Sequence, residues 1–145
     1  MEVLASWIDW ANKTPNSYLR KMKNPTEACH KLMNPEGQIA KELVCMHHLL
    51  KPENKHHVQF IDYDEIVTEP KKTINTIYKF LGIPKFKHRF KNFTQIKVNG
   101  LGYDDAIFGE GMHTIKTKRL TKTKRNIKKI LPKEIIDTYG KIQFV

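Results

Sequence analysis

The chain has 145 residues, of which 39% are hydrophobic, 28% charged and 10% aromatic, and its formal net charge is +11. This length suits one domain, and the composition excludes collagen-like, mucin-like and wholly disordered chains. No apolar run reaches the roughly 18 residues of a membrane-spanning helix and no secretory or transit peptide is visible, so we expect a soluble, cytoplasmic protein.

The positive charge is concentrated in the C-terminal part of the chain. Residues 1–84 carry 11 basic and 10 acidic side chains, whereas residues 85–145 carry 15 basic and 5 acidic ones. Such a field attracts phosphate, sulfate or acidic polymers. Ordinary solvated lysines would give the same excess, so the charge alone leaves the partner open.

Apolar spacing and capping residues predict helices in the N-terminal part. Apolar side chains recur at helical spacing in the first segment, at Val3, Leu4, Trp7, Ile8 and Ala11. This pattern predicts a helix that starts at residue 1 or 2, and a loop is expected after it over 14–23. The Asn-Pro pairs at 24–25 and 34–35 each place a capping acceptor before a proline, so a helix should begin at each. The second helix should end near residues 51–52.

A strand, a turn and a helix are predicted over residues 57–84. Residues 57–63 alternate and are rich in β-forming side chains, which is typical of a strand. The Thr-Glu-Pro sequence at 68–70 should start a helix, and Gly82 and Pro84 should end it. Residues 85–100 look irregular or weakly extended, a glycine-rich loop spans 100–111, and two helices are expected at about 121–131 and 132–143.

Metal chemistry is not expected from this sequence. Cys29 and Cys45 lie 16 positions apart, without the close pairs of ligands that structural zinc sites use, so we expect both to be small core residues in a reducing compartment. Asp104, Asp105 and Glu110 do not follow the spacing of a calcium loop.

Three segments resemble the sulfotransferases that use 3′-phosphoadenosine-5′-phosphosulfate (PAPS). Residues 60–70, FIDYDEIVTEP, and residues 77–84, IYKFLGIP, are similar to a family strand that ends in Tyr-Glu-Asp-Leu and the helix after it, which ends in Phe-Leu-Gly. Residues 2–7, EVLASW, are similar to the helix that follows the family's 3′-phosphate-binding strand. Residues 111–116, GMHTIK, are similar to a late Gly-Leu-His-Thr-Ile-Arg motif.

The resemblance implies an α/β fold, namely the C-terminal portion of a P-loop-like three-layer sulfotransferase domain. Within this chain it would be mostly helical, with one or few parallel strands. We expect a single partial domain over 1–145, with a helical part at 1–51, a strand-turn-helix nucleotide-binding unit at 57–84, and a basic loop with C-terminal helices at 85–145.

In the family, a phosphosulfate-binding loop with its lysine, a catalytic histidine and a 3′-phosphate arginine precede the position that matches Met1, and this sequence contains none of them. Expected partners are therefore a complementary N-terminal fragment or a second copy of the chain, through self-association.

The implied function is transfer of a sulfuryl group from PAPS to a hydroxyl or amine, without a metal. Ser6 would donate to the 3′-phosphate near a helix N-terminus. Tyr63 would pack beside the adenine. Positive charge at the phosphates would come from Lys116, Lys118 and Arg119.

The acceptor stays open between a carbohydrate, a protein and a small molecule. His113 would contact the acceptor or anchor its loop, and no side chain is assigned as the catalytic base. The main alternative is a non-catalytic basic module that binds nucleic acid or another polyanion. A degenerate homologue that serves as an interaction partner is a third hypothesis.

Overall fold

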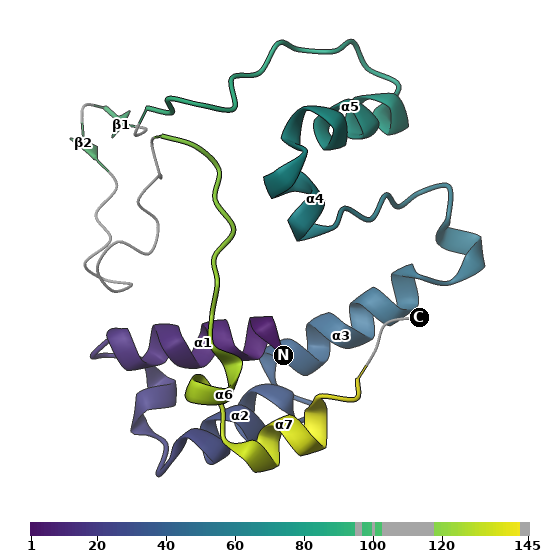
Figure 1. Ribbon diagram of the computed structural model, residues 1–145. Helices are drawn as coiled ribbons and strands as arrows, with labels where there is room; N and C mark the ends of the chain where they lie inside the picture. Colours follow the sequence, from purple (N-terminus) through teal and green to yellow (C-terminus); the bar gives the residue numbers. More distant parts are fainter. Residues whose placement is uncertain (95–96, 100, 103–117, 143–145) are drawn as a thin grey trace. The chain divides into compact units, whose positions relative to one another are not determined.

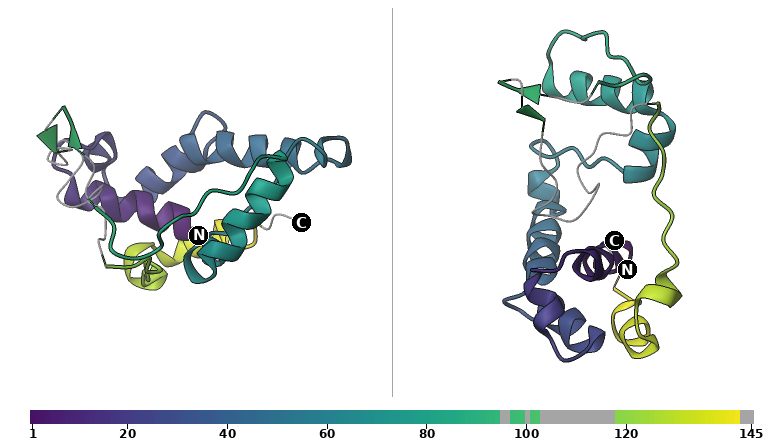
Figure 2. Two further views of the ribbon diagram at one scale, coloured as in Figure 1. Left: turned by 90° about the horizontal axis from the view of Figure 1, so that it is seen from above. Right: turned by 90° about the vertical axis from the view of Figure 1, so that its left-hand side faces the viewer.

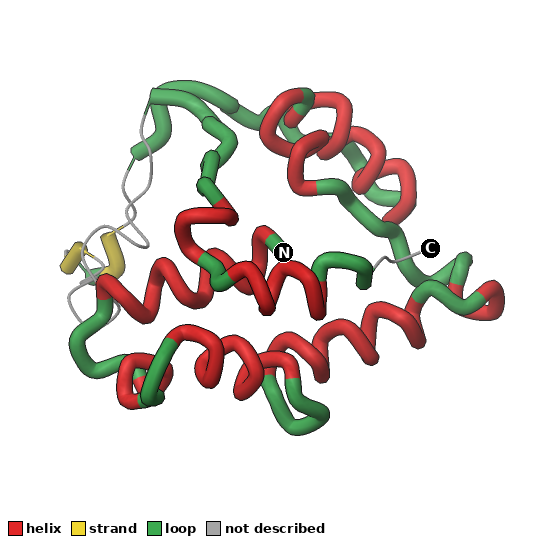
Figure 3. The backbone as a smooth tube through the Cα atoms, turned by 60° about the horizontal axis from the view of Figure 1, so that its bottom comes forward, coloured by secondary structure: helices red, strands yellow, loops and turns green. Residues whose placement is uncertain are grey.

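Helices dominate the computed structural model of the protein, which describes residues 1–94, 97–99, 101–102 and 118–142 (Figures 1 and 2). The helices are α1 (Glu2–Lys13), α2 (Pro25–Met33), α3 (Gln38–Leu49), α4 (Tyr63–Thr68), α5 (Pro70–Leu81), α6 (Ile127–Ile130) and α7 (Lys133–Tyr139). Short 3-10 turns occupy Tyr18–Lys21 and Pro52–Asn54. Two short antiparallel strands, β1 (Lys97–Val98) and β2 (Leu101–Gly102), are drawn in yellow in Figure 3.

The chain divides into two compact units, which are described separately. In its described residues, unit 1 comprises 1–51 and 124–142, and unit 2 comprises 52–94, 97–99, 101–102 and 118–123. None of the helices in the described part of either unit has both the length and the apolar character needed to cross a bilayer.

Unit 1 contains a hydrophobic core formed by its helices. The buried core side chains are Leu4, Ala5, Ile8, Ala11, Leu19, Ala28, Cys29, Leu32, Ile39, Leu131 and Ile135. On α1 these residues recur at three- and four-residue spacing, so α1 buries one face and exposes the other. Helices α1, α2, α6 and α7 pack side by side in this unit (Figure 1).

Polar contacts join α7 to α2 across more than a hundred positions of sequence. The Thr26 hydroxyl donates a hydrogen bond to the Glu134 carboxylate. Nδ1 of His30 and the Tyr139 hydroxyl are hydrogen-bonded at 2.8 Å, and their rings meet edge to face. Together with buried Ile135, these contacts hold α7 against the N-terminal helices.

Two helix boundaries confirm the signals in the sequence. The side-chain oxygen of Asn24 accepts a hydrogen bond from the Glu27 amide at 2.8 Å, and Pro25 occupies the first position of α2. Helix α5 begins at Pro70 and ends before Gly82, whose φ of 64° lies in the left-handed region.

The predicted strand over 57–63 is wrong. Residues 58–62 are irregular, and Tyr63 already begins α4. A strand exists only through hydrogen bonds to a neighbour, and no described residue pairs with this segment. Instead, the Asp62 carboxylate accepts from the amides of Asp64 at 2.6 Å and Glu65 at 3.3 Å, which starts a helix.

Three other local expectations are corrected. Asn34 ends α2 and its carbonyl accepts from the Gly37 amide at 2.7 Å, so α3 begins at Gln38 rather than at the Asn-Pro pair. The helices expected over 121–131 and 132–143 shorten to α6 and α7. Cys29 is buried as expected, but Cys45 is exposed.

Unit 2 is less well packed than unit 1. Over residues 52–94 and 118–123, Thr73 is the single fully buried side chain. Large apolar side chains stay exposed in this range: Phe60, Tyr63, Phe80, Leu81, Ile83, Phe86 and Leu120. Parallel strands do not occur among the residues that the structure describes.

Candidate functional site

A cavity of about 530 Å³ in unit 2, here called the Tyr63 cavity, lies between the α4–α5 pair and the 118–123 segment. It is lined by Tyr63, Ile66, Val67, Pro70, Ile74, Phe90, Phe93, Arg119, Leu120, Thr121 and Thr123. Most of these side chains are apolar, and only a few are polar. This volume and lining are typical of small-molecule sites, which measure roughly 300–1,000 Å³.

The walls of the Tyr63 cavity are held by contacts from three parts of the chain. Capping by Asp62 fixes the start of α4, where Tyr63 is the first helical residue. The 118–123 segment is joined to residues 91–92 by a bridge between Lys91 and Arg119 and by a 3.1 Å hydrogen bond from the Asn92 amide to the Lys118 carbonyl. Further along the segment, the Lys122 ammonium pairs with the Asp64 carboxylate.

These walls offer a mixed chemistry. The apolar side chains suit a flat heterocycle, the exposed Tyr63 ring provides a stacking surface, and the guanidinium of Arg119 can donate two parallel hydrogen bonds to a phosphate. An apolar ring that carries an anionic substituent therefore fits the cavity best.

The structure brings two of the predicted site residues together, because Tyr63 and Arg119 line the same cavity. Lys118 is exposed, next to Arg119, and does not line it. Ser6 belongs to unit 1, where it is half-buried in the second turn of α1, past the first-turn amides that lack partners within a helix. Lys116 and His113 lie outside the described residues.

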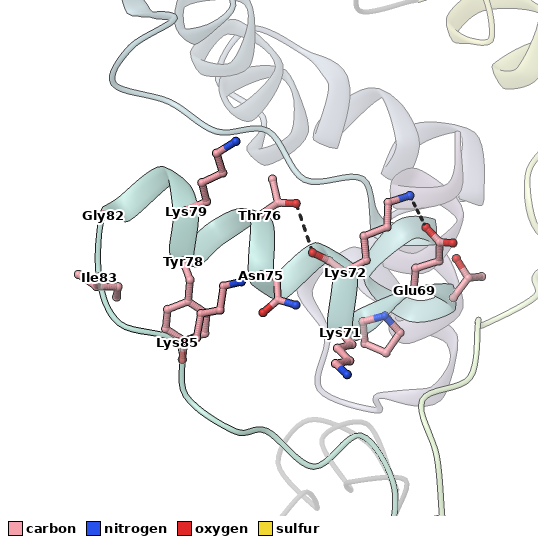
Figure 4. A pocket seen from close by; sticks show the side chains of 12 residues that line it. Glu69, Lys71, Lys72, Asn75, Thr76, Tyr78, Lys79, Gly82, Ile83 and Lys85 are labelled. Carbon is pink, nitrogen blue, oxygen red and sulfur yellow. Dashed lines mark hydrogen bonds and ion pairs between the residues drawn. The ribbon is translucent and has the colours of Figure 1, made fainter.

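A second depression, here called the α5 groove, follows one side of α5 and has a volume of about 910 Å³ (Figure 4). It is lined by Thr68, Glu69, Pro70, Lys71, Lys72, Asn75, Thr76, Tyr78, Lys79, Gly82, Ile83 and Lys85. The Lys72 ammonium donates to the Glu69 carboxylate at 2.7 Å. This hydrogen bond and the negative charge of Glu69 raise the pKa of Lys72, so this lysine stays protonated.

A cluster of rings lies between the two cavities. The Tyr78 hydroxyl and Nε2 of His88 are hydrogen-bonded at 2.7 Å. The His88 ring also meets Phe86 at 5.1 Å and Phe90 at 6.1 Å between centroids. A ring recess of about 210 Å³ is lined by Lys71, Ile74, Asn75, Phe86, Lys87, His88 and Phe90.

The ring cluster was not predicted from the sequence, because His88 was not singled out. The signal was present in the alternation of Phe86, His88 and Phe90, since alternate side chains of an extended segment point to the same side.

The other reactive groups among the described residues do not form a further centre. Burial raises the pKa of the Cys29 thiol to about 11, so it stays protonated and is a poor nucleophile. Within the ranges that the structure covers, no three histidine, cysteine or acidic side chains gather in a way that could hold a metal ion.

Comparison with known proteins decides the family. A family model described as a sulfotransferase domain matches residues 2–137. The chain belongs to the sulfotransferase family. No curated protein and no solved structure gives a match.

The match confirms the resemblance seen in the sequence, and it includes the residues that line the Tyr63 cavity and the α5 groove. Sulfotransferases generally use PAPS as the co-substrate, so membership in the family implies a nucleotide and an acceptor.

Proposed function

We propose that this sulfotransferase domain binds PAPS, or its product adenosine 3′,5′-bisphosphate (PAP), with the adenine in the Tyr63 cavity. The observation that carries the proposal is the presence of Tyr63 and Arg119 in one cavity, because the family resemblance assigns both residues to the nucleotide. The Tyr63 ring would stack on the purine, and the apolar side chains of α4 and α5 would cover its edge.

The phosphates of the nucleotide would be held by cations of the C-terminal third. Arg119 suits this role because its planar guanidinium can contact two phosphate oxygens at once. The contacts predicted for Ser6, Lys116 and Lys118 remain predictions, as does the contact of His113 with the acceptor.

The reaction that this nucleotide would serve is sulfuryl transfer to a hydroxyl or amine. The acceptor oxygen or nitrogen forms a bond to sulfur, and the bond between sulfur and the 5′-phosphate oxygen breaks. PAP leaves with the bonding electron pair, and the acceptor proton passes to a base. Cations near the phosphates would favour the step because negative charge develops on the leaving group.

Calorimetric titration of the chain with PAP tests this proposal without requiring turnover. Tyr63→Ala should weaken binding by about 5- to 160-fold, because stacking of a base on an aromatic ring contributes roughly 1–3 kcal/mol. Arg119→Gln should weaken it by about tenfold or more, because a hydrogen bond to a charged group contributes about 1.5–3 kcal/mol.

Two matched controls separate the cavity from the overall charge. Tyr18→Ala removes an exposed ring in unit 1, and Arg89→Gln removes an exposed cation that does not line the Tyr63 cavity. Both should keep the affinity within about twofold. Equal losses in Arg89→Gln and Arg119→Gln, together with binding that depends mainly on salt, would favour a non-specific polyanion module and contradict the proposal.

A further inference from the structure

Residues 70–103 carry an unusual run of charge, with eight basic side chains and no acidic one. The basic residues are Lys71, Lys72, Lys79, Lys85, Lys87, Arg89, Lys91 and Lys97. Four of these lysines do not line the Tyr63 cavity. Lys71, Lys79, Lys85 and Lys87 line the α5 groove or the ring recess instead.

The α5 groove and the ring recess form one connected surface. They share Lys71 and Asn75, so the recess continues the groove along α5. The recess also shares Ile74 and Phe90 with the Tyr63 cavity. A ligand long enough to follow this surface would therefore lead from the lysines to the edge of the proposed nucleotide site.

The lysines on this surface are available for a ligand. Of those that line the groove, Lys72 is occupied by Glu69, the one carboxylate in the lining. Lys71, Lys79 and Lys85 form no ion pair within the part of the chain that the structure describes. Lysine ammonium groups are mobile point charges, which suit several separated anionic groups better than one rigidly held anion.

The rest of the lining suits a sugar chain. Phe86 is 70% exposed and offers an apolar face to the C–H side of a pyranose ring. The Asn75 amide can donate to and accept from sugar hydroxyls, and the Thr76 hydroxyl, which donates to the Lys72 carbonyl at 3.2 Å, can still accept from one. The His88 ring contacts both Phe86 and Phe90, so Phe86 offers one exposed face rather than the series of free faces on which successive nucleic-acid bases stack.

We propose that the α5 groove and the ring recess bind an acidic polysaccharide, with uronate or sulfate groups on Lys71, Lys79, Lys85 and Lys87 and a sugar ring against Phe86. The role of this polysaccharide as the acceptor rests on the proposed sulfotransferase function. Sulfuryl transfer needs an acceptor that offers hydroxyls or amines, and a polysaccharide carries such groups along its chain. The extended surface with several cations favours a polymer over a small molecule.

Fluorescence anisotropy with a labelled heparin octasaccharide tests the proposal. The double variant Lys71→Gln with Lys87→Gln should bind about tenfold more weakly than the unaltered chain. Lys128→Gln with Lys129→Gln removes the same charge from exposed positions in unit 1 and should change the affinity by less than about twofold. Equal losses in the two double variants would show that only net charge matters and would overturn the proposal.

The contact with the sugar ring has its own matched pair. Phe86→Ala should weaken octasaccharide binding by about threefold or more, whereas Phe80→Ala, which removes a ring outside both depressions, should not. A single-stranded oligonucleotide of equal charge provides the competing ligand. If it binds as tightly as the octasaccharide and loses affinity in the same variants, the polysaccharide assignment is wrong.

The two proposals fail in different ways. The Lys71 and Lys87 side chains do not line the Tyr63 cavity, so their double variant should keep its affinity for PAP. Octasaccharide binding without PAP binding would contradict the proposed function and leave the binding surface in place. PAP binding without octasaccharide binding would contradict the surface alone.

Discussion

Replacement of Ile135 by alanine should lower the free energy of unfolding of unit 1 by about 3–4 kcal/mol. Ile135 lies on α7, and its side chain is 0% exposed. Removing three methylene-sized groups from a buried side chain costs about 2.4 kcal/mol in transfer free energy. A residual cavity of about 50 Å³ would add about 1.2 kcal/mol, at 24 cal/mol per Å³.

Tryptophan fluorescence during urea unfolding measures this loss in unit 1 alone. Trp7 and Trp10 are the two tryptophans of the chain, and both pack against the core of unit 1. Since urea lowers the stability of small proteins by about 1–3 kcal/mol per molar, the midpoint should fall by about 1–4 M.

Ile142→Ala provides the control, because it removes the same atoms from a side chain that is 48% exposed. Its effect should stay within about 0.5 kcal/mol. If Ile135→Ala costs less than about 1 kcal/mol, or no more than the control, then α7 does not pack on the N-terminal helices and the described core of unit 1 is wrong.

Three further predictions concern local features of the fold. Asn24→Ala should cost about 1 kcal/mol in the same fluorescence assay, because the Glu27 amide loses its capping acceptor; an unchanged midpoint would contradict the cap. Gly82→Ala should lower the free energy of local opening at the end of α5 by about 1–2 kcal/mol, which amide exchange would measure as faster exchange. The cause is the φ of 64°, which is strained for alanine, since the added Cβ would meet no neighbouring atom; exchange equal to that of the parent chain would count against this prediction. The contribution of Cys29 to stability should be fully present below about pH 9, where the thiol of the unfolded chain begins to ionise, and about 2–3 kcal/mol should be lost as the pH rises toward 11, because burial raises the pKa of the folded thiol to about 11. Cys29→Ala should show a shallower fall over this window, and identical pH profiles would refute the assignment.

Sequence signals succeeded where the stabilising contact is local. The Asn24 cap, the proline at the start of α5 and Gly82 at its end act on residues within a few positions of themselves. The local sequence is therefore sufficient to predict these helix ends. The alternation over residues 57–63 failed because a strand depends on a distant partner, whereas the Asp62 carboxylate forms its contacts two and three residues away.

Only part of the candidate site could be located from the sequence. The resemblance pointed to Tyr63 and Arg119, and both line one cavity. The ring cluster around His88 was not found, because the alternation of Phe86, His88 and Phe90 that signals it was not singled out. The charge on this segment was visible in the sequence, but only the shared lining of the groove and the recess relates it to a binding surface.

The ion pair between Asp64 and Lys122 has a consequence for biosynthesis, since 58 positions separate its partners. A ribosome releases α4 and α5 well before the segment that completes the wall beside Tyr63. A ligand of this cavity that is present during translation therefore cannot act as a template for the early helices. Ligand capture in the Tyr63 cavity must await synthesis of Lys122, and a chain that stalls before this residue should emerge with the cavity open on one side.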